Sequence, residues 1–256
     1  MTGFRLIRIL CIAVLAISLL PQAADAGKRG PITEKIVFIP HDSRPISNKQ
    51  TADVVQRVGY EVVAPPMELL GNREDWGHPD ELWTWLEESL ARPGVKAAVI
   101  SSDAVIYGSL VGSRKHSFTR AQVLERAARF DALQKSYPKI PLYVFGSIMR
   151  TPRSGEASGH EEPEYYRRYG ADIFRYTLLQ DKEEVEGLTR RERKEYDFLG
   201  RLIPKEALAD WMGRREKNYA VNEYLIDLMR RRGTFRYLTL GRDDNAPFSQ
   251  THMESR

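Results

Sequence analysis

Two adjacent aspartates, Asp243 and Asp244, are the sharpest chemical feature of the sequence. They follow the largely apolar segment FRYLTLGR, and neighbouring carboxylates repel each other unless a ligand, a cation or a shared proton relieves them. Such repulsion can raise the pKa of one carboxyl toward neutrality, so that it donates a proton while its partner stays ionised. Glycoside hydrolysis uses this division of roles. In the alternative, the side chains point apart, one capping a helix and the other solvated.

Polar residues also follow the other apolar segments. Asp103 ends the segment KAAVISSD, where it can act as a nucleophile, as a base or as the acceptor for a sugar hydroxyl; the alternative is a hydrogen-bonded aspartate at a strand end. Guanidinium groups offer fixed donors to a carboxylate or phosphate. The candidates for substrate binding are Asp42, Arg44, Tyr107, Arg114, Arg150 and Asn245.

Several well-known motifs are missing from the sequence. It has no GxSxG elbow, P-loop or GxGxxG, and Ser43, Ser101 and Ser102 have no recognisable histidine partner, which disfavours serine hydrolases and nucleotide-dependent enzymes. The five histidines lack the paired spacing of metal ligands. We therefore predict no metal and no cofactor, with His41 beside Asp42 as the exception worth testing.

A long polar loop follows the fourth apolar segment. It runs from Ser154 to Tyr166 and is expected to cover a site, with Tyr165 and Tyr166 stacking on a sugar. Glu161 and Glu162 in this loop are reserve candidates for the acid.

Strand-like and helix-like segments alternate along most of the chain. Strands are predicted at 36–42, 61–66, 96–108, 141–149 and 235–244, with helices near 48–58, 80–91 and 119–136 and a helical insertion at about 151–236. This alternation predicts an α/β fold with a parallel sheet. The sheet is either an open doubly wound sheet or part of an incomplete TIM-barrel-like fold, and in both the site lies at the carboxyl ends of the strands.

Composition and the N-terminal segment bound the class of protein. The chain has 256 residues, 42% hydrophobic and 29% charged, with a net charge of +4 spread over mixed signs; this indicates a globular protein that does not bind nucleic acid. Arg5 and Arg8 precede a short apolar run that ends before Ala24-Asp25-Ala26, as in a signal peptide over residues 1–26. We expect a single domain over 27–256 in a secreted or extracytoplasmic protein, without stable membrane insertion after cleavage; a membrane anchor is the alternative.

The motifs IPHDSRPISN, APPMELLGN, SSDAVIYGSLVGSR, GSIMR, EEPEYYRRYG and LGRDDNAPFS together resemble a bacterial family, the domain of unknown function 4127. The resemblance runs from about Ile36 to Pro247. It implies a barrel-like α/β protein with the candidate residues at motif positions, but no particular reaction. This chain departs from the family pattern at His41, where an aliphatic residue is usual. Because family members are usually longer, we expect this chain to be truncated at its C-terminus.

These features together favour a carbohydrate-active hydrolase, in which Asp243 and Asp244 share the acid and polarising roles and Asp103 holds or attacks the sugar. One alternative is an extracytoplasmic metal-dependent phosphoester hydrolase that uses Asp42, His41, Asp103 and Asp243. Another is a glycan-binding protein without chemistry. In each case the expected partner is a small molecule or a glycan.

Overall fold

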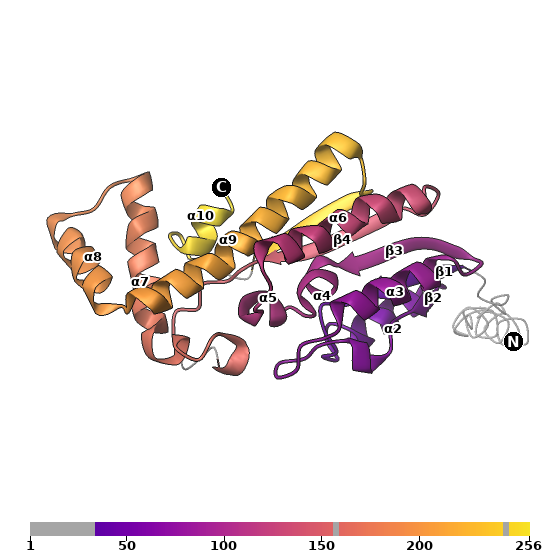
Figure 1. Ribbon diagram of the computed structural model, residues 1–256, viewed down its shortest axis with the longest axis horizontal. Helices are drawn as coiled ribbons and strands as arrows, with labels where there is room; N and C mark the ends of the chain where they lie inside the picture. The colour runs from indigo at the N-terminus through magenta and orange to yellow at the C-terminus, as the bar shows by residue number, and fades with distance from the viewer. Residues whose placement is uncertain (1–33, 156–158, 243–245) are drawn as a thin grey trace, which may run out of the picture. The chain divides into compact units, whose positions relative to one another are not determined.

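The computed structural model describes residues 34–155, 159–242 and 246–256. The chain divides into two compact units, Met1–Ile32 and Thr33–Arg256, and the second contains all the described residues (Figure 1). The predicted signal peptide and the aspartates at 243 and 244 lie outside the described residues. Within the described ranges, no helix combines the length and the apolar character needed to cross a membrane.

A parallel five-stranded sheet forms the centre of this unit. Its strands are β1 (Lys35–Ile39), β2 (Glu61–Val63), β3 (Val95–Ser101), β4 (Leu142–Ile148) and β5 (Tyr237–Arg242), in the order β2-β1-β3-β4-β5. In a TIM barrel, β2 would lie between β1 and β3. Here β1 lies between β2 and β3 and pairs with both, so the sheet is open and doubly wound. The barrel-like alternative is corrected by this strand order.

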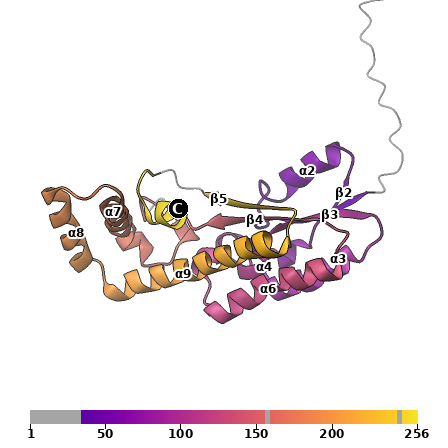
Figure 2. The same cartoon turned by 90° about the horizontal axis from the view of Figure 1, so that it is seen from above.

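Helices cover the sheet from both sides (Figure 2). Helix α2 (Lys49–Arg57) lies on one side, and α3 (Pro79–Leu90), α6 (Arg120–Ser136) and α9 (Lys205–Asp227) lie on the other. Helix α6 begins where the sequence predicts, because Thr119 and Gln122 form a capping box that satisfies the first backbone N–H groups. The remaining short elements are η1 (Met67–Leu69), α4 (Ser102–Tyr107), α5 (Gly112–Lys115), η2 (Gly159–Glu161) and α10 (Gln250–Glu254).

The third predicted strand is too long. The sequence predicts a strand through residue 108, but β3 ends at Ser101 and α4 starts at once. The cause is local: the Ser101 hydroxyl accepts the Ala104 N–H at 3.3 Å and caps the new helix. This early turn places Asp103 in the first turn of α4 instead of in an extended loop.

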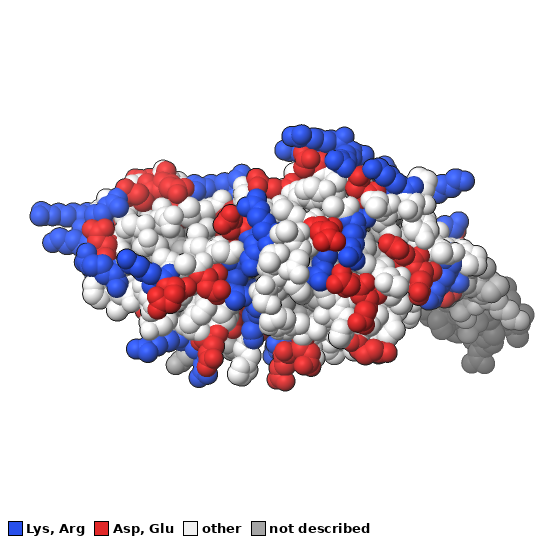
Figure 3. Space-filling view, in the orientation of Figure 1, with Lys and Arg blue, Asp and Glu red and all other residues white. Residues whose placement is uncertain are grey.

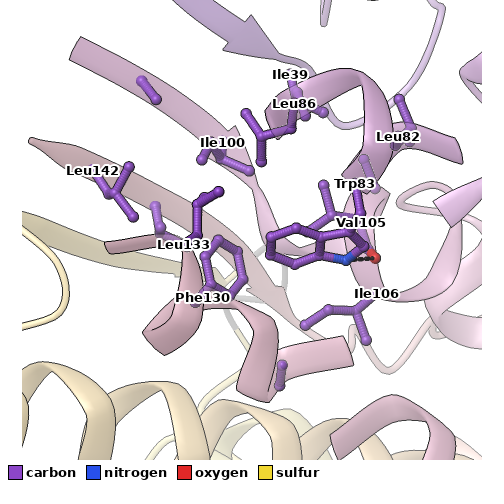
Figure 4. Close-up of a cluster of buried hydrophobic side chains, with 14 of the residues drawn as sticks. Ile39, Leu82, Trp83, Leu86, Ile100, Val105, Ile106, Phe130, Leu133 and Leu142 are labelled. Atoms are coloured by element: carbon purple, nitrogen blue, oxygen red, sulfur yellow. Dashed lines mark hydrogen bonds between the residues drawn. The ribbon is translucent and has the colours of Figure 1, made fainter. Parts of the chain in front are cut away.

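The core lies between the sheet and helices α3 and α6 (Figure 4). Trp83 and Phe130 meet edge to face with ring centroids 4.9 Å apart, and Trp83 Nε1 donates to the Val105 carbonyl at 2.9 Å. Leu82, Leu86 and Ile100 are fully buried around them. Each such side chain stabilises the fold by about 1.5–3 kcal/mol. This packing holds the strands in place, and with them the residues that follow their carboxyl ends.

The insertion between β4 and β5 is helical, as predicted. It contains α7 (Tyr166–Val185), α8 (Arg190–Leu202), α9 and the π-helical turn η3 (Leu228–Arg232). It has its own buried cluster, made of Tyr166, Ile173, Leu179, Leu199, Ile203 and Trp211. Figure 1 shows α7 and α8 beyond the end of the sheet to which the strand arrows point. On the face drawn in Figure 3, cationic and anionic side chains are interspersed.

Candidate active site at the switch point between β1 and β3

The strand order creates one favoured place for a ligand. The chain runs from β1 to β2 on one side, then crosses back to β3 on the other side of β1. The loops that follow β1 and β3 therefore diverge, and open α/β sheets bind ligands in the crevice outside the carboxyl ends of such a pair. His41 follows β1, and Asp103 follows β3.

His41 and Asp103 meet at this crevice. His41 Nδ1 lies 3.1 Å from Asp103 Oδ2, and the side chains are 24% and 2% exposed. Among the described residues, that buried oxygen has no hydrogen-bond donor with good alignment; catalytic contacts in ligand-free sites are often poorly aligned. The Phe145 ring meets the His41 ring edge-on at 4.7 Å. His41 is therefore a partly exposed histidine with Nδ1 against a buried carboxylate.

Ser101 also contacts His41, which corrects the expectation that it has no histidine partner. Its hydroxyl lies 2.9 Å from His41 Nδ1. In a serine hydrolase, however, the serine and the carboxylate contact opposite nitrogens of the imidazole. Here both contact Nδ1, and Ser101 is fully buried as the cap of α4. Ser101 therefore positions His41 and is not placed as a nucleophile.

Asp42 holds Arg44 in a fixed orientation. Asp42 is fully buried, and its Oδ2 accepts from Arg44 Nε at 2.9 Å and from Nη2 at 2.6 Å. The Arg44 backbone N–H donates to the other carboxylate oxygen at 3.1 Å. Two donations from one guanidinium to a single buried carboxylate oxygen restrict the orientation of the guanidinium. Asp42 therefore acts through Arg44 and is not open to a substrate.

Four arginines from four separate segments surround Glu161, and we call them the arginine cluster: Arg44, Arg73, Arg114 and Arg150. The Glu161 Oε1 atom lies 3.1 Å from Arg73 Nε and 3.5 Å from Arg44 Nη1. The Oε2 atom lies 3.1 Å from Arg150 Nη2 and 3.2 Å from Arg114 Nη1. Each carboxylate oxygen thus faces two guanidinium groups, as the oxygens of a bound anion would.

Glu162 lies beside the same arginines but is more deeply buried. Its Oε1 accepts from Arg150 Nε at 3.1 Å and lies 3.7 Å from Arg114 Nη1. Burial raises the pKa of Glu162, although Arg114 and Arg150 act in the opposite direction.

A close approach of backbones holds the loop of Arg73 against α4. Gly108 ends α4 with a φ of 98°, in the left-handed region, and a Cβ there would lie 2.8 Å from the Gly77 carbonyl oxygen. Gly71 and Gly77 bound the GNREDWG loop. Glycine at these contacts lets the loop that carries Arg73 pack directly on the end of α4.

Tyr107 and His116 lie beneath the site. Tyr107 is buried and stacks on His116 with ring centroids 4.9 Å apart. Burial and the negative charge of Asp103 raise the pKa of Tyr107. Burial, helped by Lys217 and Arg214, lowers the pKa of His116 to about 3. Tyr107 therefore supports α4 from the core. The sequence predicts that it binds the substrate, but its side chain is buried and does not reach one.

A comparison with known protein families matches residues 36–256 to the family described as "Protein of unknown function (DUF4127)". The chain belongs to this family. No curated protein and no solved structure matches it. All the described residues of the site lie within the part of the chain that matches DUF4127.

The structure brings together part of the predicted site of this DUF4127 protein. Arg44, Arg114 and Arg150 converge, and Asp103 lies at the switch point. The predicted Asp243, Asp244 and Asn245 lie outside the described residues. Among the described residues, no group of three or more His, Cys, Asp or Glu side chains is arranged to hold a metal ion.

Sequence reasoning missed three features of this DUF4127 site. Arg73 is not among the predicted residues, although its position in a glycine-bounded loop after the second strand is a usable signal. The sequence suggests His41 only as a metal ligand, whereas its neighbour at the site is Asp103. The sequence suggests Glu161 as a reserve acid, but four guanidinium groups contact it.

Proposed function

We propose that this protein is an exported hydrolase that cleaves a carbohydrate substrate at the switch point between β1 and β3, with His41 as the catalytic base. The observation that supports this proposal best is the contact between His41 Nδ1 and the buried Asp103 carboxylate at 3.1 Å. A carboxylate this close to Nδ1 favours the tautomer with the proton on that nitrogen, and the Ser101 hydroxyl at 2.9 Å helps to orient the ring.

Proton transfer at His41 follows from this pairing. When Asp103 is ionised, Nδ1 carries the proton and Nε2 is the basic nitrogen. His41 Nε2 then takes a proton from a water molecule that attacks the anomeric carbon, while the imidazolium that forms is stabilised by Asp103. Asp103 acts through His41, so it is a positioning residue in this proposal rather than the nucleophile or sugar ligand.

The leaving oxygen of a glycoside also requires a proton. Glu162 is not placed to supply it, because its side chain is as deeply buried as those of Asp42 and Tyr107 and accepts from Arg150. Asp243 and Asp244 remain the candidates predicted from the sequence. Replacing Asp243 or Asp244 with Asn tests this assignment, because loss of the acid slows substrates with poor leaving groups much more than those with good ones.

Export is a further part of the proposal and rests on the N-terminal sequence alone. Arg5, Arg8 and the apolar run that follows have the pattern of a signal peptide. N-terminal sequencing of the protein recovered from the producing cell tests it: a mature chain that starts at Gly27 supports export, and an uncleaved chain contradicts cleavage there.

The test of the activity is a turnover screen with nitrophenyl glycosides, neutral and acidic, and with nitrophenyl phosphate as the competing class. We expect turnover of a glycoside that EDTA does not affect. In Asp103→Asn, kcat should fall by about 100-fold or more while KM stays nearly constant, because general base catalysis contributes about 10²–10⁴. Asp53→Asn, at an exposed carboxylate paired with Lys49, is the matched control.

Two outcomes would overturn the proposal. Turnover of the phosphate ester alone, abolished by EDTA, would instead assign a metal-dependent phosphoester hydrolase. Sugar binding without turnover of any substrate would assign a glycan-binding protein.

A further inference from the structure

We infer that the arginine cluster is a binding site for an anionic group, a carboxylate or a phosphate, and that the Glu161 carboxylate occupies this site when no ligand is bound. The inference rests on the proposed function only in taking the anion to be part of the substrate. Binding itself can be measured without turnover.

The geometry around Glu161 is the first argument. Two guanidinium groups face each of its oxygens, at 3.1 and 3.5 Å for Oε1 and at 3.1 and 3.2 Å for Oε2. The four arginines come from the segment after β1, the loop before α3, helix α5 and the segment after β4. Donors collected from four segments around two oxygens match the planar carboxylate or the phosphate that arginine recognises.

The burial of the cluster is the second argument. Arg114 is 3% exposed, whereas Glu161 is 15% exposed and Arg73 is 67% exposed. The cluster is thus buried at Arg114 and open to solvent at Arg73, and Glu161 lies between these two side chains. A buried guanidinium loses its hydration, so it binds an anion more strongly than a surface arginine does.

The anchoring of two arginines is the third argument. Asp42 holds Arg44 through two hydrogen bonds, and Glu162 holds Arg150. These contacts do not involve Glu161, so they keep both guanidinium groups in place when the Glu161 carboxylate leaves. Preorganised donors of this kind bind a ligand at low cost in conformational entropy.

Glu161 is part of the short element η2, whose other described polar contact to the body is the donation from Lys115 Nζ to the His160 carbonyl at 2.8 Å. Displacement of Glu161 therefore requires the movement of one side chain and one short turn. An acidic sugar, such as a uronate, would place its carboxylate there.

The test measures anion binding by titration calorimetry to the full chain and to Glu161→Gln, with sodium glucuronate, inorganic phosphate and, as the neutral probe, glucose. Chloride keeps the ionic strength constant. Because Glu161→Gln removes the internal competitor, it should bind an anion at least about tenfold more tightly than the wild type. Glu164→Gln, at an exposed glutamate nearby, should bind like the wild type, and adding Arg73→Ala to Glu161→Gln should weaken binding again.

Each outcome decides the inference. Preference for glucuronate assigns a carboxylate ligand, and preference for phosphate assigns a phosphate ligand. If Glu161→Gln unfolds, recovery of a cooperative transition in phosphate or glucuronate but not in chloride supports the site, and no recovery overturns it. Equal affinity in the wild type and Glu161→Gln, or binding of glucose alone, also overturns it. Anion binding by a protein that hydrolyses nothing would leave this inference standing and refute the proposed function.

Discussion

Replacing Arg215 with Met should destabilise the protein strongly. Arg215 is fully buried in α9 and donates to both Glu254 oxygens at 2.7 Å, to the Met149 carbonyl at 2.7 Å and to the Arg150 carbonyl at 2.8 Å. It also lies over the Trp211 ring at 4.7 Å. This one side chain therefore joins α9, α10 and the end of β4.

The magnitude follows from the groups left behind. Methionine retains the apolar volume, but the Glu254 carboxylate loses its cation and keeps only the donation from the Gln250 amide. The Arg150 carbonyl loses the Arg215 donor, whereas the Met149 carbonyl still accepts from the Thr251 hydroxyl. Removing one partner of a buried ion pair costs about 3–5 kcal/mol. The Glu254 side chain is 10% exposed, so water that reaches its carboxylate offsets part of this cost. We expect the free energy of unfolding to fall by about 4 kcal/mol.

Urea denaturation followed by tryptophan fluorescence measures this loss, because Trp211 lies against the guanidinium. Arg231→Met is the control, since Arg231 forms an exposed pair with Asp227 that contributes about 0–1 kcal/mol. Adding Glu254→Met to Arg215→Met should recover part of the loss, because no buried charge is then left unpaired. A loss below about 1 kcal/mol in Arg215→Met, or one equal to that in the control, would show that the buried Arg215–Glu254 pair does not hold α9 and α10 together.

Three further predictions concern stability. The pKa of His116 is lowered to about 3 from 6.5, so the unfolded chain takes up a proton at this histidine before the folded protein does. The free energy of unfolding should therefore fall as the pH is lowered from 6.5 toward 3, by at most about 5 kcal/mol from this residue. Urea denaturation at several pH values should show a smaller dependence of the free energy of unfolding on pH in His116→Asn. Thr189→Ala removes the capping box of α8 and should cost about 1 kcal/mol in urea denaturation, whereas no change would show that this cap is not needed. Gly108→Ala should cost about 1–3 kcal/mol because of its φ of 98° and its contact with Gly77, whereas Gly213→Ala, with open space around it, should be neutral or stabilising; equal changes in melting temperature would contradict this.

The sheet could be predicted from the sequence because its signals are local. Apolar runs rich in β-branched residues, separated by helix caps such as Thr119, fixed four of the strand positions closely. The error at β3 also has a local cause, since Ser101 can cap a helix as readily as it can extend a strand. The choice between an open sheet and a barrel depends on which strands pair, and no local pattern encodes that.

The site was predicted only in part, for the same reason. Polar residues at strand ends are visible in the sequence, and Arg44, Arg114 and Arg150 do converge. Which acid meets which base depends on the strand order: β1 and β3 are neighbours, so His41 meets Asp103 instead of acting with Asp42. Arg73 reaches Glu161 across 88 positions in the chain, a pairing that no spacing rule predicts.

The role of His41 is tested by comparing kcat in His41→Gln and His78→Gln on the glycoside that the wild type turns over. His78 is exposed and outside the site, so its replacement should leave kcat unchanged. His41→Gln should lower kcat by about 100-fold or more with an unchanged melting temperature. Equal turnover in the two variants would contradict the assignment of His41 as the catalytic base at the switch point.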